Sequence, residues 1–218
     1  MAGDRLEPVP GFAEAPGRET WYTPWGGPPD VRSLARGPEG SLFVNVHVGG
    51  VLRWGPGAGG WRPTLDIDAD VHQVVAHPTR PGVVLVAAAA GLGISEDGGG
   101  TWSFTIEGLA ATYCRAVAVA DDRIFLSASR GPSGGGAALY RTSFGERRLT
   151  RLRGGLPERF STNIDTHCLA ARGDEVVAAD PAGAVYFSGD GGETWERRLD
   201  DLPRVHAVAF DRAAEITR

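Results

Sequence analysis

The stretch SEDGGGTW at residues 95–102 recurs as SGDGGETW at residues 188–195, and this pair decides the fold. The two tryptophans, Trp102 and Trp195, are 93 positions apart, which is two periods of about 46 residues. Decayed copies lie at residues 17–21, 54–61 and 140–146. Self-similarity at a fixed period of this size indicates a repeat architecture in which each repeat is one small unit of secondary structure.

The motif predicts a turn that is stapled by its own side chains. Asp97 and Asp190 are expected to accept main-chain N–H groups within the turn, and the glycines supply the positive φ where the chain reverses. Each threonine adds a hydroxyl, and each tryptophan buries a large ring at the start of the next strand. We therefore assign the motif residues to folding and not to chemistry: Ser95, Asp97, Gly99, Thr101, Trp102, Ser188, Asp190, Gly192, Thr194 and Trp195.

A second column of residues repeats in phase with the motif. Each unit has a strand of small residues that ends in a Leu-Ala or Val-Ala pair, at Ala35, Ala76, Ala118, Ala170 and Ala209. Three further strand-length segments separated by turns follow each of the first four pairs. The sequence therefore predicts four-stranded antiparallel blades with almost no helix, and innermost strands near residues 31–35, 71–76, 113–118, 165–170 and 205–210. The 32 glycines agree with many tight turns.

At these intervals the motif resembles the BNR or Asp-box repeat of sialidase-like β-propellers, as found in bacterial members of that family. The resemblance covers residues 17–212 and implies an all-β propeller, with residues 1–16 as a disordered or extended N-terminal segment and residues 213–218 as a tail. Four complete blades are expected, together with an orphan outermost strand near Trp21 and an orphan innermost strand near residues 205–210. This count indicates an incomplete or truncated propeller; the alternatives are an irregular five-bladed closure or closure through a partner. Exposed blade edges would favour self-association.

Composition excludes several classes of function. The net charge is −5, which argues against binding to nucleic acid, and all 22 basic residues are arginine, which rules out a Schiff-base lysine or a phosphate-loop lysine. We expect no cofactor. The N-terminus lacks a signal-peptide core and no segment is long enough to cross a membrane. Two cysteines are too few for a disulfide framework, so a cytoplasmic protein with free thiols is expected.

A polar column marks the candidate ligand site. Three residues before each column alanine lies a polar side chain: Arg32, Gln73, Arg115, His167 and His206. Innermost strands surround the propeller axis, so these residues are expected to form a ring near one mouth of the channel. Loops just before the strands add Asp30, Tyr113, Asn163, Asp165 and Arg204. The ring predicts either a site for a small anionic or carbohydrate ligand or the solvated lining of a channel.

Other polar residues are given structural interpretations. His72 lies outside the polar column, and His77 before Pro78 is expected to be a turn residue. Cys114 and Cys168 are expected to be buried thiols. A metal site at His167, His206 and Cys168 has no ligand spacing to support it, so no metal site is predicted.

Three classes of function remain after these exclusions. The family resemblance implies a sialidase-like glycoside hydrolase, for which Arg32 and Arg115 match two of the expected three arginines, and Tyr113 with Asp165 is the nearest nucleophile pair. No third arginine and no Arg-Ile-Pro motif can be placed, so no catalytic residue is assigned. The second class is a non-catalytic binding or scaffold module for a protein or a small ligand, and we favour it. A different hydrolase or lyase at the same ring is the remaining alternative.

Overall fold

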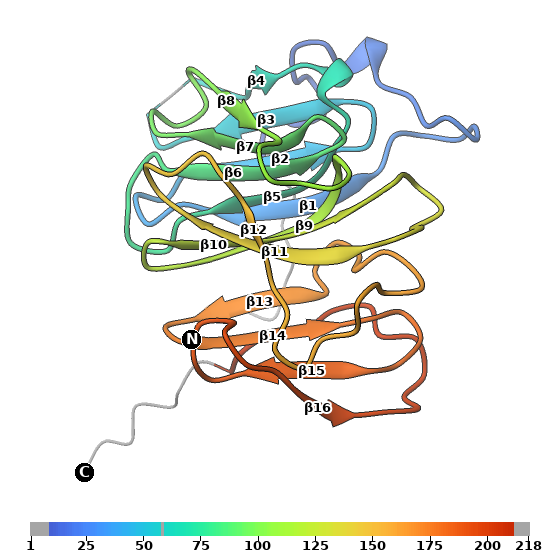
Figure 1. Ribbon diagram of the computed structural model, residues 1–218. Helices are drawn as coiled ribbons and strands as arrows, with labels where there is room; N and C mark the ends of the chain where they lie inside the picture. The colour runs from blue at the N-terminus through green and yellow to red at the C-terminus, as the bar shows by residue number, and fades with distance from the viewer. Residues whose placement is uncertain (1–8, 58, 212–218) are drawn as a thin grey trace.

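Sixteen β-strands and two short 3-10 turns make up the computed structural model, which describes residues 9–57 and 59–211. The strands form four antiparallel sheets of four, and each sheet uses four strands that are consecutive in sequence. We name these sheets blades 1 to 4 in chain order (Figure 1). The prediction of an all-β, propeller-like chain built from four-stranded antiparallel units is confirmed.

Each blade runs from an innermost strand to an outermost strand in chain order. Blade 1 consists of β1 (Val31–Arg36), β2 (Leu42–Val46), β3 (Gly50–Trp54) and β4 (Arg62–Leu65). Blade 2 consists of β5 (Val71–Ala76), β6 (Val84–Ala88), β7 (Gly91–Ser95) and β8 (Ser103–Thr105). Blade 3 consists of β9 (Tyr113–Ala120), β10 (Arg123–Ser129), β11 (Ala138–Ser143) and β12 (Thr150–Arg151). Blade 4 consists of β13 (Leu169–Arg172), β14 (Glu175–Ala179), β15 (Val185–Ser188) and β16 (Glu196–Leu199). The turns are η1 (Arg18–Thr20) and η2 (Ile67–Ala69).

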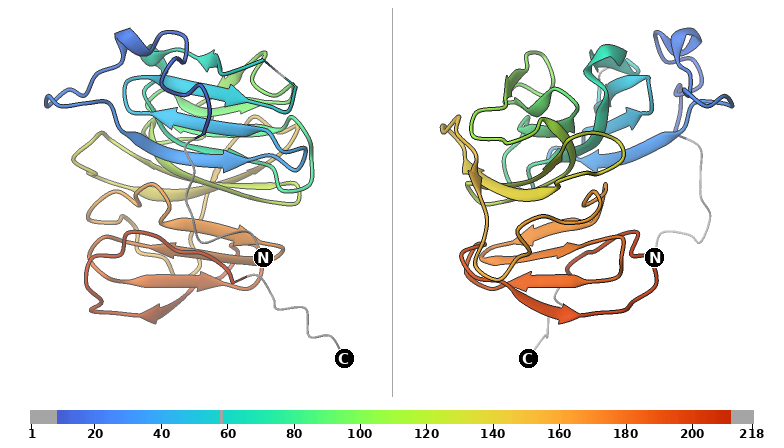
Figure 2. Two further views of the ribbon diagram at one scale, coloured as in Figure 1. Left: turned by 180° about the vertical axis from the view of Figure 1, so that it is seen from behind. Right: turned by 45° about the vertical axis from the view of Figure 1, so that its right-hand side comes forward.

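The blades fan out from a common axis. The innermost strands are neighbours in the order β1, β5, β9 and β13, and the other strands of each blade lie further from the axis (Figure 2). Blades 1 and 4 are the two ends of the fan, so each has one face that no other blade covers within the described residues. The ends of the innermost strands therefore lie close together at the axis.

The core consists of the layers between neighbouring blades. On β10, Leu126 packs toward blade 2 whereas Phe125 packs toward blade 4, because successive side chains of a strand point to opposite faces. Both side chains are fully buried. A third layer around Phe43 and Val84 joins blades 1 and 2. Continuous apolar runs such as Val84–Ala88 are therefore explained by strands that are covered on both faces.

Both full motifs form the stapled turn that the sequence predicts. Asp97 Oδ1 accepts a hydrogen bond from the Thr101 amide at 2.9 Å, and its Oδ2 accepts one from the Thr101 hydroxyl at 2.9 Å. The Ser95 hydroxyl donates to Asp97 and accepts from the Gly99 amide. The second motif repeats these contacts with Ser188, Asp190, Gly192 and Thr194.

These hydrogen bonds stabilise the charged form of both carboxylates. The pKa of Asp97 falls to about 2, chiefly because of the Thr101 amide, and the pKa of Asp190 falls to about 2, chiefly because of the Thr194 hydroxyl. The two tryptophans differ, however. Trp195 is buried between blades 3 and 4 and its Nε1 donates to the Gly192 carbonyl, whereas Trp102 is only partly buried, so the expectation of full burial is wrong for Trp102.

Two strands that the sequence predicts do not form among the described residues. No strand forms near Trp21: η1 precedes it, and the Trp21 ring packs on blade 1 with Phe12 and Trp61. The decayed copy at residues 17–21 has Pro16 where the full motif has its aspartate, so no carboxylate is present to staple the turn. Residues 205–210 belong to no sheet, and two hydrogen bonds join them to the turn before β13: the Val208 amide donates to the His167 carbonyl and the Cys168 thiol donates to the Val205 carbonyl.

The innermost strand of blade 4 also starts later than predicted. It begins at Leu169, because residues 165–168 form a turn in which the Cys168 amide donates to the Asp165 carbonyl at 2.9 Å. His167 has φ 67° in this turn and is therefore not a strand residue. Of the predicted N-terminal segment, residues 1–16, the first eight lie outside the described residues, as does the predicted tail at residues 213–218. Residues 9–16 form turns, and Phe12 and Ala15 pack with Trp21 and Trp61 on blade 1.

Candidate functional site

A small polar pocket lies where the inner strands converge at the axis. Its volume is about 210 Å³, and its walls come from blade 1, blade 3, the turn before β13 and the segment after blade 4. The lining residues are Arg32, Arg115, Asp165, Thr166, Cys168, Arg204, Val205 and His206. We call this the axial pocket. It brings together residues that are up to 174 positions apart in the sequence.

One carboxylate in the axial pocket is shared by two arginines. Arg115 donates to Asp165 Oδ1 from Nη2 at 2.8 Å and from Nε at 3.2 Å. Arg204 Nη2 donates to Asp165 Oδ2 at 3.3 Å. Asp165 therefore neutralises one positive charge while three guanidinium groups line the pocket, so the pocket keeps a net positive charge.

Arg32 is the guanidinium of the pocket lining that forms no ion pair with a carboxylate in the described part of the chain. Its Nη1 is buried and has no hydrogen-bond partner among residues 9–57 and 59–211. Burial and the nearby Arg115 charge both lower the pKa of Arg32, while Asp30 and Asp70 act on it from beyond ion-pair distance. A buried guanidinium N–H without an acceptor is costly, so this atom is ready to donate a hydrogen bond to an anion.

The arginines are aimed into the pocket by irregularities in the innermost strands. The pairing of β1 with β2 skips Arg32, and the pairing of β9 with β10 skips Arg115 and Ala116. In blade 2 the skipped residue is His72 and not Gln73. Such bulges redirect a side chain toward the other face of the strand and are frequent next to functional sites.

Gln73 and His167 lie beneath the axial pocket and do not line it. The Gln73 carboxamide oxygen accepts hydrogen bonds from the Val117 amide at 3.2 Å and the His167 amide at 3.4 Å. His167 Nε2 lies 3.3 Å from the Arg32 carbonyl oxygen. The Thr166 hydroxyl donates to the carbonyls of His72 and Arg115. These contacts join blades 1, 2 and 3 to the turn before β13.

His72 is fully buried beside the axial pocket, although the polar column of the sequence did not include it. Its Nδ1 lies 2.6 Å from the Cys114 carbonyl oxygen, and its ring packs against Tyr113 with 4.5 Å between ring centroids. Its Nε2 is buried and 3.6 Å from Asp70 Oδ1. Burial outweighs the Asp70 charge and lowers the pKa of His72 to about 4, so the ring is neutral at pH 7.

The structure thus brings together only part of the predicted ring. Arg32, Arg115, Asp165 and His206 line one pocket, whereas Gln73, His167 and Tyr113 support it from behind. Arg204, which the sequence placed among the nearby loops, is a lining residue, and Thr166 is a lining residue that sequence reasoning missed. The polar pair Asp165-Thr166 just before the blade 4 column is the signal that could have identified it.

The two thiols and His77 have structural roles. Cys114 and Cys168 are free and buried, and burial raises their thiol pKa values to about 12 and about 11. His77 Nδ1 accepts hydrogen bonds from the amides of Thr79 and Arg80 in a turn. Within residues 9–57 and 59–211, no group of three His, Cys, Asp or Glu side chains is placed to hold a metal ion.

Comparisons with known proteins support the fold. No protein-family model matches the sequence, and no curated protein matches it. Among solved structures, the GH74 enzyme of Niastella koreensis superimposes with a TM-score of 0.60 at 15% identity, over 78% of this chain and 30% of that chain. The GH74 xyloglucanase of Xanthomonas campestris gives a TM-score of 0.58 at 18% identity, over 75% and 29%. The computationally designed Ika8 protein gives 0.55 at 15% identity, over 86% and 54%.

These likenesses define a propeller-like fold and no more. This chain spans about 30% of the length of the two GH74 proteins and about half of the designed protein. At identities below one fifth, a shared fold does not transfer an activity. In the part of the chain that the structure describes, no helix has the length and apolar character needed to cross a membrane.

Proposed function

We propose that this chain is an Asp-box propeller that acts as a binding module and takes a small carboxylate-bearing ligand in the axial pocket. The observation that carries the proposal is the Arg32 guanidinium, whose buried Nη1 has no acceptor among the described residues and which lies beside a second arginine. A guanidinium presents a planar fork of donors that matches a carboxylate. A carboxylate at Arg32 would fill that fork and reduce the repulsion between Arg32 and Arg115.

Binding is favoured over turnover by the groups around the pocket. Glycoside hydrolysis ordinarily uses two carboxyl groups on either side of the scissile bond. Asp165 is the one carboxylate in the pocket lining among the described residues, and it is engaged by Arg115 and Arg204. The cysteine thiols have raised pKa values, so neither supplies a thiolate nucleophile near pH 7.

A ligand screen by thermal shift tests this proposal. The probes are acetate, citrate, glucuronate, N-acetylneuraminate and inorganic phosphate, each measured with the wild type and with an Arg32→Ala, Arg115→Ala double variant. At least one carboxylate is expected to raise the Tm of the wild type and to lose that effect in the double variant. Arg153→Ala is the matched control, because Arg153 is exposed and lies outside the pocket.

Two results would count against the proposal. Equal ligand-induced shifts in the wild type and the double variant would show that the axial pocket does not hold the ligand. Hydrolysis of a fluorogenic sialoside or xyloglucan oligosaccharide, abolished by the double variant, would replace the binding module by a glycoside hydrolase.

A further inference from the structure

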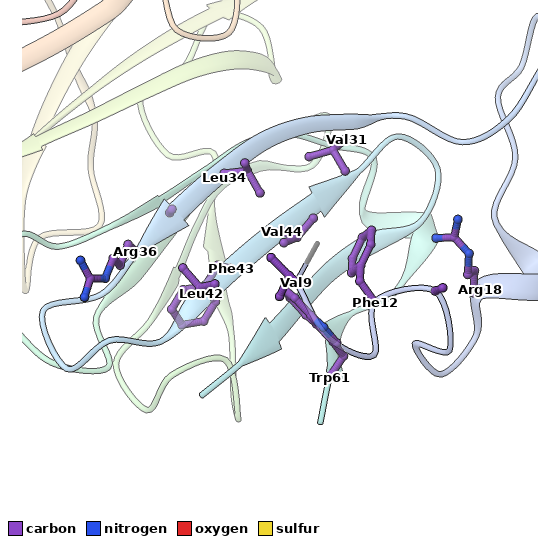
Figure 3. Close-up of a pocket in the computed structure, with 12 residues that line it drawn as sticks. Val9, Phe12, Arg18, Val31, Leu34, Arg36, Leu42, Phe43, Val44 and Trp61 are labelled. Carbon is purple, nitrogen blue, oxygen red and sulfur yellow. The ribbon is translucent and has the colours of Figure 1, made fainter. Parts of the chain in front are cut away.

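An apolar groove lies on the uncovered face of blade 1, away from the axial pocket. It has a volume of about 700 Å³ and is formed by β1, β2 and the N-terminal segment around Phe12. Leu34 is 67% exposed and Val31 is 45% exposed, although both lie on the innermost strand of the blade. Figure 3 shows these side chains over the groove, with Arg36 at one end and Arg18 at the other. We call it the blade 1 groove.

Exposed apolar side chains gather at the two ends of the fan. Eight large apolar side chains are exposed within residues 9–57 and 59–211. Val9, Val31 and Leu34 belong to the blade 1 groove, whereas Leu199 and Leu202 lie at the end of β16 on blade 4. The two middle blades contribute only Ile106 to the described set, and the remaining two, Tyr22 and Trp25, lie in the segment before β1. Such clustering marks an interaction surface, since isolated exposed apolar residues would be spread over the molecule.

The two ends also differ in charge. Leu199 and Leu202, 51% and 36% exposed, flank Asp200 and Asp201 in the sequence Leu-Asp-Asp-Leu, which we call the blade 4 knob. Asp200 pairs with Arg197, and Asp201 has no ion pair among the described residues. Arg18 and Arg36 at the blade 1 groove likewise have no ion pair within that part of the chain. An apolar surface bracketed by arginines thus complements an apolar knob that carries aspartates.

We infer that copies of this chain associate head to tail, with the blade 4 knob of one copy seated in the blade 1 groove of the next. The two surfaces are different, so the contact is heterologous and builds either a closed ring or an open chain of copies. The contact would bury Leu34, Val31, Leu199 and Leu202 and would pair Asp201 with an arginine at the groove. It uses none of the residues that line the axial pocket.

Size-exclusion chromatography with light scattering tests the inference on the full chain. The wild type is expected to have a mass above 23.0 kDa that increases with concentration. Leu34→Asp and the pair Leu199→Asp, Leu202→Asp should each give a monomer, with an unchanged circular dichroism spectrum because all three side chains are exposed. Ile106→Asp is the matched control, since Ile106 is 51% exposed but follows β8 of blade 2, and it should associate as the wild type does.

Mixing the two monomeric variants decides the geometry. The Leu34→Asp chain keeps an intact knob and the Leu199→Asp, Leu202→Asp chain keeps an intact groove, so a mixture should form a 1:1 complex although neither forms one alone. An Arg36→Glu chain should also be monomeric and should regain association with an Asp201→Arg chain. A wild type that stays monomeric at every concentration, or a mixture that stays monomeric, would overturn the inference.

Discussion

Arg141 of blade 3 donates a hydrogen bond of 2.6 Å from Nη1 to the carbonyl oxygen of Gly191 in the stapled turn of blade 4. Arg53 of blade 1 makes the equivalent contact of 3.1 Å with Gly98 in the stapled turn of blade 2. Each stapled turn is therefore fixed to the preceding blade by an arginine on the third strand. The turns link neighbouring blades as well as neighbouring strands.

Arg141→Met should destabilise the protein because the carbonyl of the buried Gly191 loses a charged donor. The expected loss in the free energy of unfolding is about 1–2 kcal/mol, measured by urea denaturation. Arg148→Met is the control, because the Arg148 side chain is 72% exposed and should change stability little. Equal losses in the two variants would show that the blade-to-blade contact contributes nothing.

The two motif tryptophans should differ in their contribution to stability. Trp195→Ala removes a ring that is buried between blades 3 and 4 and should cost about 3–5 kcal/mol in the free energy of unfolding. Trp102→Ala should cost clearly less, because Trp102 is only partly buried. Denaturation of both variants under the same conditions gives the comparison, and a larger loss for Trp102→Ala would contradict it.

Asp190→Ala should lower the Tm at neutral pH and leave ligand binding unchanged. The pKa of Asp190 is about 2 in the folded protein and 3.8 ordinarily, so its contribution is complete above about pH 4 and is lost as the pH falls toward 2. The Tm difference between the wild type and Asp190→Ala should therefore shrink over this range. A variant that folds normally but loses ligand binding would show that Asp190 acts in the site.

His72 should make the folded state sensitive to mild acid. Its pKa is about 4 when folded and 6.5 ordinarily, so the unfolded chain binds the extra proton between these values and stability falls as the pH drops from 6.5 to 4. The loss is of the order of 2–3 kcal/mol. His72→Asn, which keeps a donor for the Cys114 carbonyl, should flatten the curve of unfolding free energy against pH. Arg153→Ala gives the control, because Arg153 is exposed and arginine does not titrate in this pH range, so this variant should keep the wild-type slope.

The strands could be predicted from the sequence because the turn residues and the apolar strand residues indicate the same repeat. Glycines at turns and apolar strand residues recur in phase, and the innermost strands β1, β5 and β9 begin at the predicted residues, whereas β13 begins four residues late, at Leu169. The prediction failed where tertiary contacts decide. At residues 165–168 the pairing of Asp165 with Arg115 and Arg204 holds a turn in place of a strand.

The axial pocket was predictable only in outline. The polar column identified Arg32 and Arg115, because both lie at the start of an innermost strand. In blade 2 the column selected Gln73, whereas the bulged residue is His72. A bulge in β5 shifts the alternation of side chains by one residue, and no residue type in the sequence predicts that bulge. The blade 1 groove was missed because it depends on which faces the blades leave uncovered.

Isothermal titration calorimetry of the wild type and Arg32→Ala with the carboxylate that gives the largest thermal shift is the most direct test of the proposed site. Loss of one charge-assisted, bidentate contact should weaken the Kd about 10- to 100-fold. Arg153→Ala, outside the pocket, should retain the wild-type Kd. If the carboxylate binds at Arg32, the affinity should weaken in Arg32→Ala and not in Arg153→Ala. An unchanged Kd in Arg32→Ala would contradict the proposed site.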